Sequence, residues 1–417
     1  MRFLPPLALL VAVLIPCTLA DQPRKDEPPA RKALVVHEWG VFRVHNDIEL
    51  ANADMRAVWN ELPKFVYGQV SGRELPKFWR NVELVDKPVL FFHTPDPVDV
   101  ELRIDFPAGY PGVWWPGTQT PAIRYGTLTP AAKDGEPFRF LEWQLSLKEA
   151  PKGMRKDIAS RPVDDKHWVK TLRAVQADDV YARVGEQNQG CERERFVYYD
   201  GLLPRGKWVE ITVEKEKIAL VNRAEHPVFD VTVVDGRTAS HTRVARIAKL
   251  DSKATITELE FRDEDAEAWP ASGHDALTRQ LKDAGLLEDE AKSLVDLWKE
   301  DLFSSPGLTL FYRLPQEEYD RLLPLKMKPR PEKLVRVGLV QHPHCEPDLA
   351  DRVAALAKDL DNDDFETRER AQDRLDEMGR AAFVHLAKLR RQIKGAEAQR
   401  RLDELLDKHD AEKAFKR

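Results

Sequence analysis

The segment VLFFHTPDPVDVELRIDF, residues 89–106, contains the clearest β-strand pattern of this sequence. An apolar run, Val89–His93, is followed by a turn at Thr94–Pro97, and strict alternation of apolar and charged residues begins at Val98. Five apolar residues of this second run point to one side: Val98, Val100, Leu102, Ile104 and Phe106. An alternation with a period of two and one polar face predicts an antiparallel strand that lies on a core.

Similar runs predict strands through most of the chain. We expect them at residues 34–44, 138–147, 195–199, 208–213, 217–221, 228–234, 308–314 and 334–340, with two more between 242 and 261. Short helices are expected near residues 52–62, 164–178 and 316–323. A helix pair at 275–284 and 288–303 would form a helical insertion at about residues 273–303. We therefore predict an α+β protein whose body, residues 33–346, is an antiparallel β-sandwich-like unit with helical insertions.

Residues 347–417 have a helical pattern throughout. Helices are expected at 349–360, 365–378, 381–393 and 396–409, and Gly379 and Gly395 lie where the second and third should end. Asp364 is expected to cap the second helix. A segment of this size forms only a marginal core by itself. We expect this small all-α domain to pack on the body or on a partner, either a protein or a cell-surface polymer.

The first twenty residues have the pattern of a signal peptide. Arg2 precedes an apolar run from Leu4 to Ile15, and Thr18 and Ala20 supply small residues before Asp21. This pattern predicts cleavage after Ala20 and a secreted or periplasmic protein. The charged, proline-rich residues 21–32 are expected to be a disordered linker. Nothing later in the chain is apolar enough to suggest a transmembrane anchor.

The composition sets further bounds. A charged fraction of 33% with a net charge of −6 gives a solvated surface without the basic stripe of a nucleic-acid-binding protein. Of three cysteines, Cys17 would leave with the signal peptide, so Cys191 and Cys345 would remain. In an oxidising compartment they permit one disulfide, and two free thiols are the alternative.

Several segments resemble a known group of proteins. His37-Glu38-Trp39-Gly40 resembles the HEWG segment of a group of secreted bacterial proteins without an assigned activity, although Val41 stands where that group tends to have threonine. Residues 87–117, 294–315 and 322–340 are similar to further stretches of the same group. Residues 360–386 resemble a HEAT-type helical repeat. The resemblance implies export and the two-part architecture, and it implies no catalytic residue.

His37, Glu38 and Trp39 are candidate binding residues. On a strand, neighbouring side chains point to opposite faces, so His37 should share a face with Trp39 and Glu38 should point away, unless a bulge near Gly40 redirects one of them. Zinc-protease spacing requires a second histidine at position 41, which is valine. The alternative is a structural histidine beside a strand end.

His342 and His344 are candidate metal ligands, close to Cys345 and Glu346. Imidazole suits zinc or copper, and a third ligand would have to come from elsewhere, for example from His93 or His37. An exposed linker without metal, with Cys345 bonded to Cys191, is the alternative. The leading expectation for the protein as a whole is that it has no cofactor.

Trp114 and Trp115 occur in a segment rich in glycine and proline, AGYPGVWWPGTQTP. Adjacent tryptophans on a rigid loop could stack against sugar rings, whereas the alternative is that one of them fills a core.

The chain has no GxSxG elbow, no P-loop and no CxxC motif. We therefore expect an exported, non-enzymatic binding or scaffold module. One alternative is an extracytoplasmic, metal-dependent hydrolase, and a second is a glycan-binding, wall-associated protein.

Overall fold

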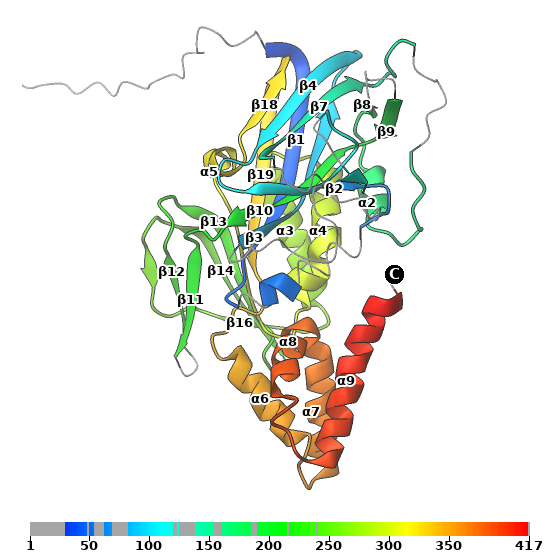
Figure 1. The fold of residues 1–417 in the computed structure, drawn as a ribbon. Helices are drawn as coiled ribbons and strands as arrows, with labels where there is room; N and C mark the ends of the chain where they lie inside the picture. The colour runs from blue at the N-terminus through cyan, green and yellow to red at the C-terminus, as the bar shows by residue number, and fades with distance from the viewer. Residues whose placement is uncertain are drawn as a thin grey trace, which may run out of the picture.

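The computed structural model describes residues 30–47, 50–53, 62–68, 82–119, 123–124, 138–153, 160–184, 190–214, 217–238 and 241–415. It shows an α+β protein with a sheet-rich body followed by C-terminal helices (Figure 1). The signal peptide expected at residues 1–20 lies outside the described residues, as does most of the linker expected at 21–32. The first strand, β1 (Ala30–Arg43), nevertheless begins inside the expected linker, because residues 30 and 31 already pair with Arg330 and Pro331.

The body is built around one large mixed sheet. Among the described residues, eleven strands form it in the order β16-β14-β13-β17-β19-β1-β3-β10-β5-β2-β6. Near its middle, β1 pairs in parallel with β19 (Arg330–His342) and antiparallel with β3 (Val82–His93). The expectation of a purely antiparallel body was therefore wrong at this pair. Parallel neighbours need a long connection, and here almost the whole body lies between the two strands.

The alternating segment of residues 98–106 behaves as predicted. β4 (Val98–Asp105) belongs to a five-stranded sheet of the described residues, ordered β18-β4-β7-β8-β9, whereas β3 belongs to the large sheet. The turn at residues 94–97 thus carries the chain from one sheet to the other. Val100, Leu102 and Ile104 of β4 share one buried cluster with Leu90 and Phe92 of β3, so the apolar face of β4 lies on the core.

The remaining strands have the following bounds. They are β2 (Tyr67–Gly68), β5 (Tyr110–Trp115), β6 (Ile123–Arg124), β7 (Phe140–Leu147), β8 (Val180–Val184), β9 (Gly190–Glu194), β10 (Val197–Pro204), β11 (Val209–Glu214), β12 (Lys217–Asn222), β13 (Val228–Asp235), β14 (Thr242–Leu250), β15 (Thr255–Ile256), β16 (Arg262–Glu264), β17 (Leu308–Arg313) and β18 (Leu325–Lys328). β11, β12 and β15 form a small separate sheet within the described residues.

One face of the large sheet packs against β4 and its neighbours, and helices cover the other face. α3 (Trp269–Asp283) and α4 (Glu288–Phe303) are the expected insertion, with α3 beginning six residues earlier than predicted. Their apolar residues, among them Leu294 and Trp298, form a second buried cluster with Trp39 and Phe91 of the sheet. The helix expected at 164–178 is confined to α2 (Val169–Ala174), and α5 (Gln316–Leu322) precedes β18. Of the helix expected at 52–62, residues 50–53 are helical and 54–61 lie outside the described residues.

Four helices follow the body. They are α6 (Leu349–Asp359), α7 (Phe365–Met378), α8 (Arg380–Leu389) and α9 (Ala396–Phe415). Asp364 caps α7 as predicted, since its side chain accepts a hydrogen bond from the Thr367 amide.

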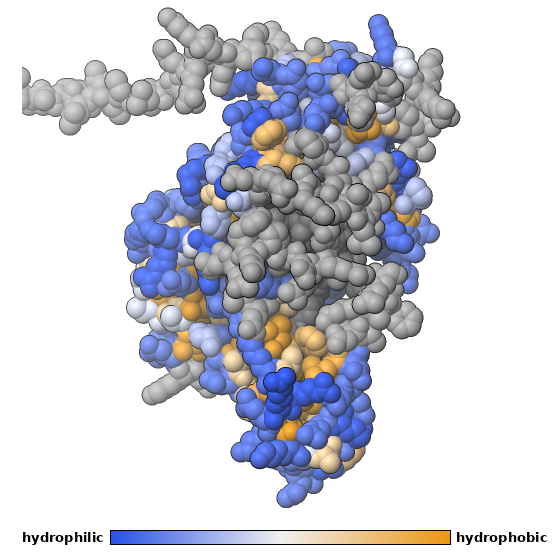
Figure 2. Space-filling model, viewed as in Figure 1, coloured by the Kyte–Doolittle hydropathy of each residue, from blue (hydrophilic) through white to orange (hydrophobic). Residues whose placement is uncertain are grey.

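These helices are packed on the body. Leu50 belongs to their buried cluster, and the Arg374 guanidinium donates to the carbonyls of Gly236 and Arg237 at 2.8 and 2.9 Å. On the face drawn in Figure 2, hydrophobic residues gather where the body meets the C-terminal helices. Among the described residues, we find no helix with the length and hydrophobicity needed to cross a bilayer.

Candidate metal centre

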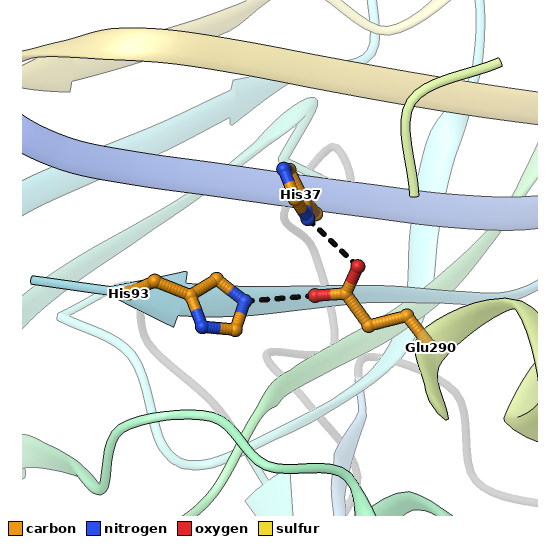
Figure 3. A group of neighbouring side chains, drawn as sticks. All are labelled: His37, His93 and Glu290. Carbon is orange, nitrogen blue, oxygen red and sulfur yellow. Dashed lines mark hydrogen bonds and ion pairs between the residues drawn. The ribbon is translucent and has the colours of Figure 1, made fainter. Parts of the chain in front are cut away.

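His37, His93 and Glu290 meet between the large sheet and α4 (Figure 3). The Glu290 carboxylate lies between the two imidazoles, with one oxygen 2.7 Å from His37 Nδ1 and the other 2.8 Å from His93 Nε2. The two rings are 5.4 Å apart between centroids. Glu290 and His37 are buried, whereas the His93 side chain is 23% exposed. The three residues therefore form a polar cluster inside the protein with an opening on the His93 side.

Three separate elements place these side chains. His37 lies opposite Phe91 in the antiparallel pairing of β1 with β3, and His93 is the last residue of β3. Glu290 is in the first turn of α4, where its carboxylate also accepts a hydrogen bond from the Leu287 amide at 2.8 Å. The same carboxylate thus caps the helix and holds both histidines, so the start of α4 is fixed over this part of the sheet.

The electrostatics keep Glu290 ionised. Burial would raise its pKa, but the hydrogen bonds from His37 and His93 outweigh burial and lower the pKa to about 2. A charged carboxylate therefore faces two imidazole nitrogens in a place with little water. The other ring nitrogen of His37, Nε2, is buried and has no hydrogen-bond partner among the described residues. Such an orphaned polar atom is uncommon in a protein core and favours a functional explanation over a purely structural one.

The donor set fits a transition metal. One ligand atom from each of the three residues lies within 4.8 Å of the other two. In a tetrahedral zinc site, bonds of about 2.0–2.2 Å place neighbouring ligand atoms about 3.3–3.6 Å apart, so the ligand atoms that are farthest apart would have to approach by at most about 1.5 Å to share one ion. Two histidines and one glutamate are the protein ligands of many catalytic zinc sites, and the same residue types hold iron in other proteins.

The segment Val175–Asp178 connects the end of β3 with the start of α4. The Gln176 amide donates to Asp289 Oδ2 at 2.6 Å, at the start of α4. The Asp178 amide donates to the Phe92 carbonyl at 2.9 Å, and the Thr94 amide donates to Asp178 Oδ2 at 2.6 Å. This segment therefore ties the two residues that flank His93 in the chain to the residue that precedes Glu290.

Glu38 points away from this cluster. It lies on the opposite face of β1, where Arg336 Nε donates to it at 2.5 Å and the Tyr199 hydroxyl donates at 2.5 Å. Glu38 and Arg336 are both fully buried, and Tyr319 also donates to Glu38, at 3.3 Å. The predicted separation of His37 and Glu38 is confirmed. Glu38 is part of a buried ion pair, and it does not take part with His37 in a shared site.

Trp39 and Gly40 serve packing. Trp39 is buried in the cluster beneath α3 and α4, on the His37 side of the strand as predicted. The register of β1 with β3 shifts between Trp39 and Val41, so a bulge does occur at Gly40. A Cβ at Gly40 would lie 2.8 Å from the Tyr319 hydroxyl and 3.1 Å from Pro88 Cα, so the close approach of these residues requires glycine.

The other predicted metal pair, His342 and His344, does not form a cluster. His342 is buried, its Nε2 is 3.2 Å from the Tyr312 hydroxyl, and burial lowers its pKa to about 3. His344 Nε2 lies 3.3 Å from the Ser305 hydroxyl. Among the described residues, the grouping that could hold a metal contains neither of them, although it does contain His37 and His93, both named from the sequence as additional ligands.

Trp114 and Trp115 are not on a loop. They end β5 in the interior of the large sheet and are 0% and 2% exposed. The Trp115 indole donates to Glu194 at 3.0 Å and stacks on Tyr67 with 6.1 Å between ring centroids. Neither tryptophan offers a ring face to a sugar in this structure, so the stacking platform is not formed, and the alternative of a tryptophan that fills a core is the one that the structure shows.

The two cysteines are free thiols. Cys191 is half-buried on β9, and Cys345 is buried after the end of β19. The alternative of two free thiols is the one that the structure shows. Burial raises the pKa of Cys191 to about 11, so its thiol stays protonated.

Sequence reasoning did not identify Glu290. The residue occurs in an acidic first turn, Glu288-Asp289-Glu290, of a kind found at many helix starts. A glutamate three residues after the cap position was the available signal, but Leu287 stands where a capping box usually has serine or threonine.

Comparisons with known proteins give no family. No protein-family model matches the sequence, and no curated protein matches it. Among solved structures, the yeast delta-COP-I mu-homology domain aligns over 76% of this chain and 98% of its own, at 9% identity and a TM-score of 0.23. A likeness at that score carries no argument about fold or function.

Proposed function

We propose that this protein is an exported metal-binding module that holds zinc, or another divalent transition metal, at His37, His93 and Glu290. The observation that carries the proposal is the convergence of the three ligand atoms within 4.8 Å, from two strands and a helix, at a largely buried position. A buried carboxylate of low pKa supplies negative charge, and the imidazoles supply the nitrogen ligands that zinc and copper favour.

Export and the finer architecture belong to the same proposal. The signal-like residues 1–20 support a secreted or periplasmic location. The apolar side chains that two sheets contribute to one cluster support a sandwich-like body. The four C-terminal helices, packed on the body through Leu50 and Arg374, would act as a HEAT-like surface for contact with a protein or a cell-surface polymer.

Metal analysis of the purified chain without residues 1–20 tests this function. We expect about one zinc ion per chain after dialysis against zinc, and an affinity at least about 100-fold weaker in His93→Ala and Glu290→Gln, a loss larger than that of an outer-shell residue. His342→Ala and His344→Ala are the matched controls, and they should bind zinc as the unaltered chain does. Circular dichroism would show that each variant is folded.

Two outcomes would overturn the metal site. One is a folded chain that takes up neither zinc, copper, iron nor manganese. The other is zinc binding that persists in folded His93→Ala and disappears in His342→Ala. In the first case the cluster is a hydrogen-bonded attachment of α4 to the sheet.

A metal-dependent hydrolase is the second candidate. It is favoured by the number of ligands, because catalytic zinc sites have three protein ligands and keep the fourth position for water. The partly exposed His93 gives the site an open side. We expect hydrolysis of an ester, phosphodiester or peptide probe that a chelator abolishes and added zinc restores. Stoichiometric zinc without turnover of any of the three probes would favour the non-enzymatic module.

A further inference from the structure

A cleft on the far side of the sheet has no part in the metal site. It encloses about 590 Å³ between the end of β10, the turn after β12, the first residues after β4 and helix α5. Volumes of this size are typical of pockets that bind small molecules. Its apolar walls include Leu203, Trp208 and Leu322. The cleft therefore has both the size and the surface to hold the apolar part of a small ligand.

Basic side chains surround this apolar surface. Arg205, Lys207 and Arg321 all line the cleft. The Arg321 guanidinium is already paired, because it donates to both oxygens of Glu318 at 2.6 and 2.7 Å. Lys207 lies 3.6 Å from Glu225, but both side chains are more than 70% exposed, so that pair is weak.

Arg205 differs from the other two. Its Nη2 donates to the His45 carbonyl at 3.1 Å, and it forms no ion pair with a carboxylate among the described residues. That backbone bond anchors the side chain of a residue that lines the cleft, and no carboxylate of the described residues occupies the other guanidinium donors. The acidic groups of the lining, Glu225 and Glu318, are paired with Lys253 and with Arg321 and His226. The charge that remains for a ligand is therefore positive.

A buried acid behind the wall, Glu83, cancels little of this charge in mildly acidic solution. Glu83 accepts hydrogen bonds from the Trp208 indole and from the Gly206 amide, both in residues of the wall. Burial raises the pKa of Glu83 to about 7, against the opposing effect of Arg205, so the carboxyl group is largely protonated in mildly acidic solution.

We propose that this cleft binds a small amphipathic anion, with its apolar body against Leu203, Trp208 and Leu322 and its anionic head at Arg205 and Lys207. Guanidinium groups recognise carboxylate, sulfonate and phosphate oxygens through paired, charge-assisted hydrogen bonds. The ligand class is thus a medium-chain carboxylate or an aromatic acid. Neutral apolar molecules of the same size would lack the contact with Arg205.

The test uses the anionic dye anilinonaphthalene sulfonate and its displacement by decanoate. We expect saturable dye fluorescence, displacement by decanoate, and weaker displacement by decanol. Arg205→Ala should weaken decanoate binding by about tenfold, the effect of losing one charge-assisted hydrogen bond, and leave decanol unchanged. Arg223→Ala is the matched control, since Arg223 is exposed, is paired with Glu210 and does not line the cleft.

A second variant tests whether the ligand binds inside the cleft. Ala108 is an exposed residue of the lining, so the larger side chain of Ala108→Trp should obstruct the cleft and weaken displaceable dye binding without disturbing the core. The proposal is overturned if Ala108→Trp binds like the unaltered chain, or if decanol displaces the dye as well as decanoate does. Equal losses in Arg205→Ala and Arg223→Ala would also overturn it. None of these results depends on zinc, so they are separate from the test of the metal site.

Discussion

His37 and Glu290 are 253 residues apart in the sequence and 2.7 Å apart in the core. Their contact joins the first strand of the body to the helical insertion that covers it. His93 adds the third strand through the other oxygen of the same carboxylate. The cluster therefore has a structural consequence whether or not a metal is bound, because α4 is attached to the sheet at its first turn.

Replacing Glu290 should destabilise the metal-free protein. In Glu290→Ala, two histidine N–H groups lose their acceptor and α4 loses its cap, and a broken buried pair of this kind costs about 3–5 kcal/mol. Urea unfolding in the presence of a chelator measures this loss. Glu288→Ala is the control, because that exposed glutamate lies in the same turn and pairs with Lys282 and Lys292. A stability of Glu290→Ala equal to that of the control would contradict the attachment.

Glu83 should make the stability depend on pH. Burial raises its pKa from 4.5 to about 7, so between these values the folded state binds more protons than the unfolded state. The free energy of unfolding should therefore fall as the pH rises through this range, by about 3 kcal/mol from this group.

Glu83→Gln isolates this contribution, since the amide imitates the protonated acid. We expect the difference in stability between the variant and the unaltered chain to grow in favour of the variant from pH 5 to pH 8. Glu210→Gln, an exposed change on the neighbouring β11, should show no such trend. A difference that stays constant across this pH range would show that Glu83 is ionised normally in the folded protein.

The buried pair of Glu38 and Arg336 should behave as one unit. Both side chains are fully buried, so removing either partner leaves an uncompensated charge, at a cost of about 3–5 kcal/mol. In a double-mutant cycle of Glu38→Gln and Arg336→Met, the double variant should lose less than the sum of the single losses, by about 1–3 kcal/mol. Additive losses, measured by denaturant unfolding, would mean that the two groups are stabilised independently.

Local pattern predicted most elements of the fold. The alternation at residues 98–106 and the helical spacing at 288–303 and 365–378 depend on neighbours in the sequence, and β4, α4 and α7 occur at those places. The parallel pairing of β1 with β19 was not predictable in this way. A strand's period reports which faces are apolar, and it contains no information about which distant strand lies beside it.

The candidate metal site was also only partly predictable from local sequence. His37 and His93 attracted attention because histidine is uncommon and ligates metals, whereas Glu290 is one acidic residue among 71. Only tertiary packing sets it apart. Trp114 and Trp115 were misplaced for the opposite reason: Pro111 and Gly112 suggested a loop, but β5 accommodates them where its register with β10 shifts between Asp200 and Gly201.

Gly40 offers a test of how closely β1 is packed. A methyl group there would lie 2.8 Å from the Tyr319 hydroxyl and 3.1 Å from Pro88, so Gly40→Ala should cost about 1–3 kcal/mol through overpacking. Tyr319→Phe removes the nearer atom, and by itself it loses a 3.3 Å hydrogen bond to Glu38, worth about 1 kcal/mol. The Pro88 contact remains in both backgrounds, so Tyr319→Phe should rescue Gly40→Ala only in part. The loss of stability caused by Gly40→Ala, measured by urea unfolding, should therefore be smaller in the Tyr319→Phe background than in the unaltered chain, and equal losses in the two backgrounds would show that the strain comes from Pro88 alone.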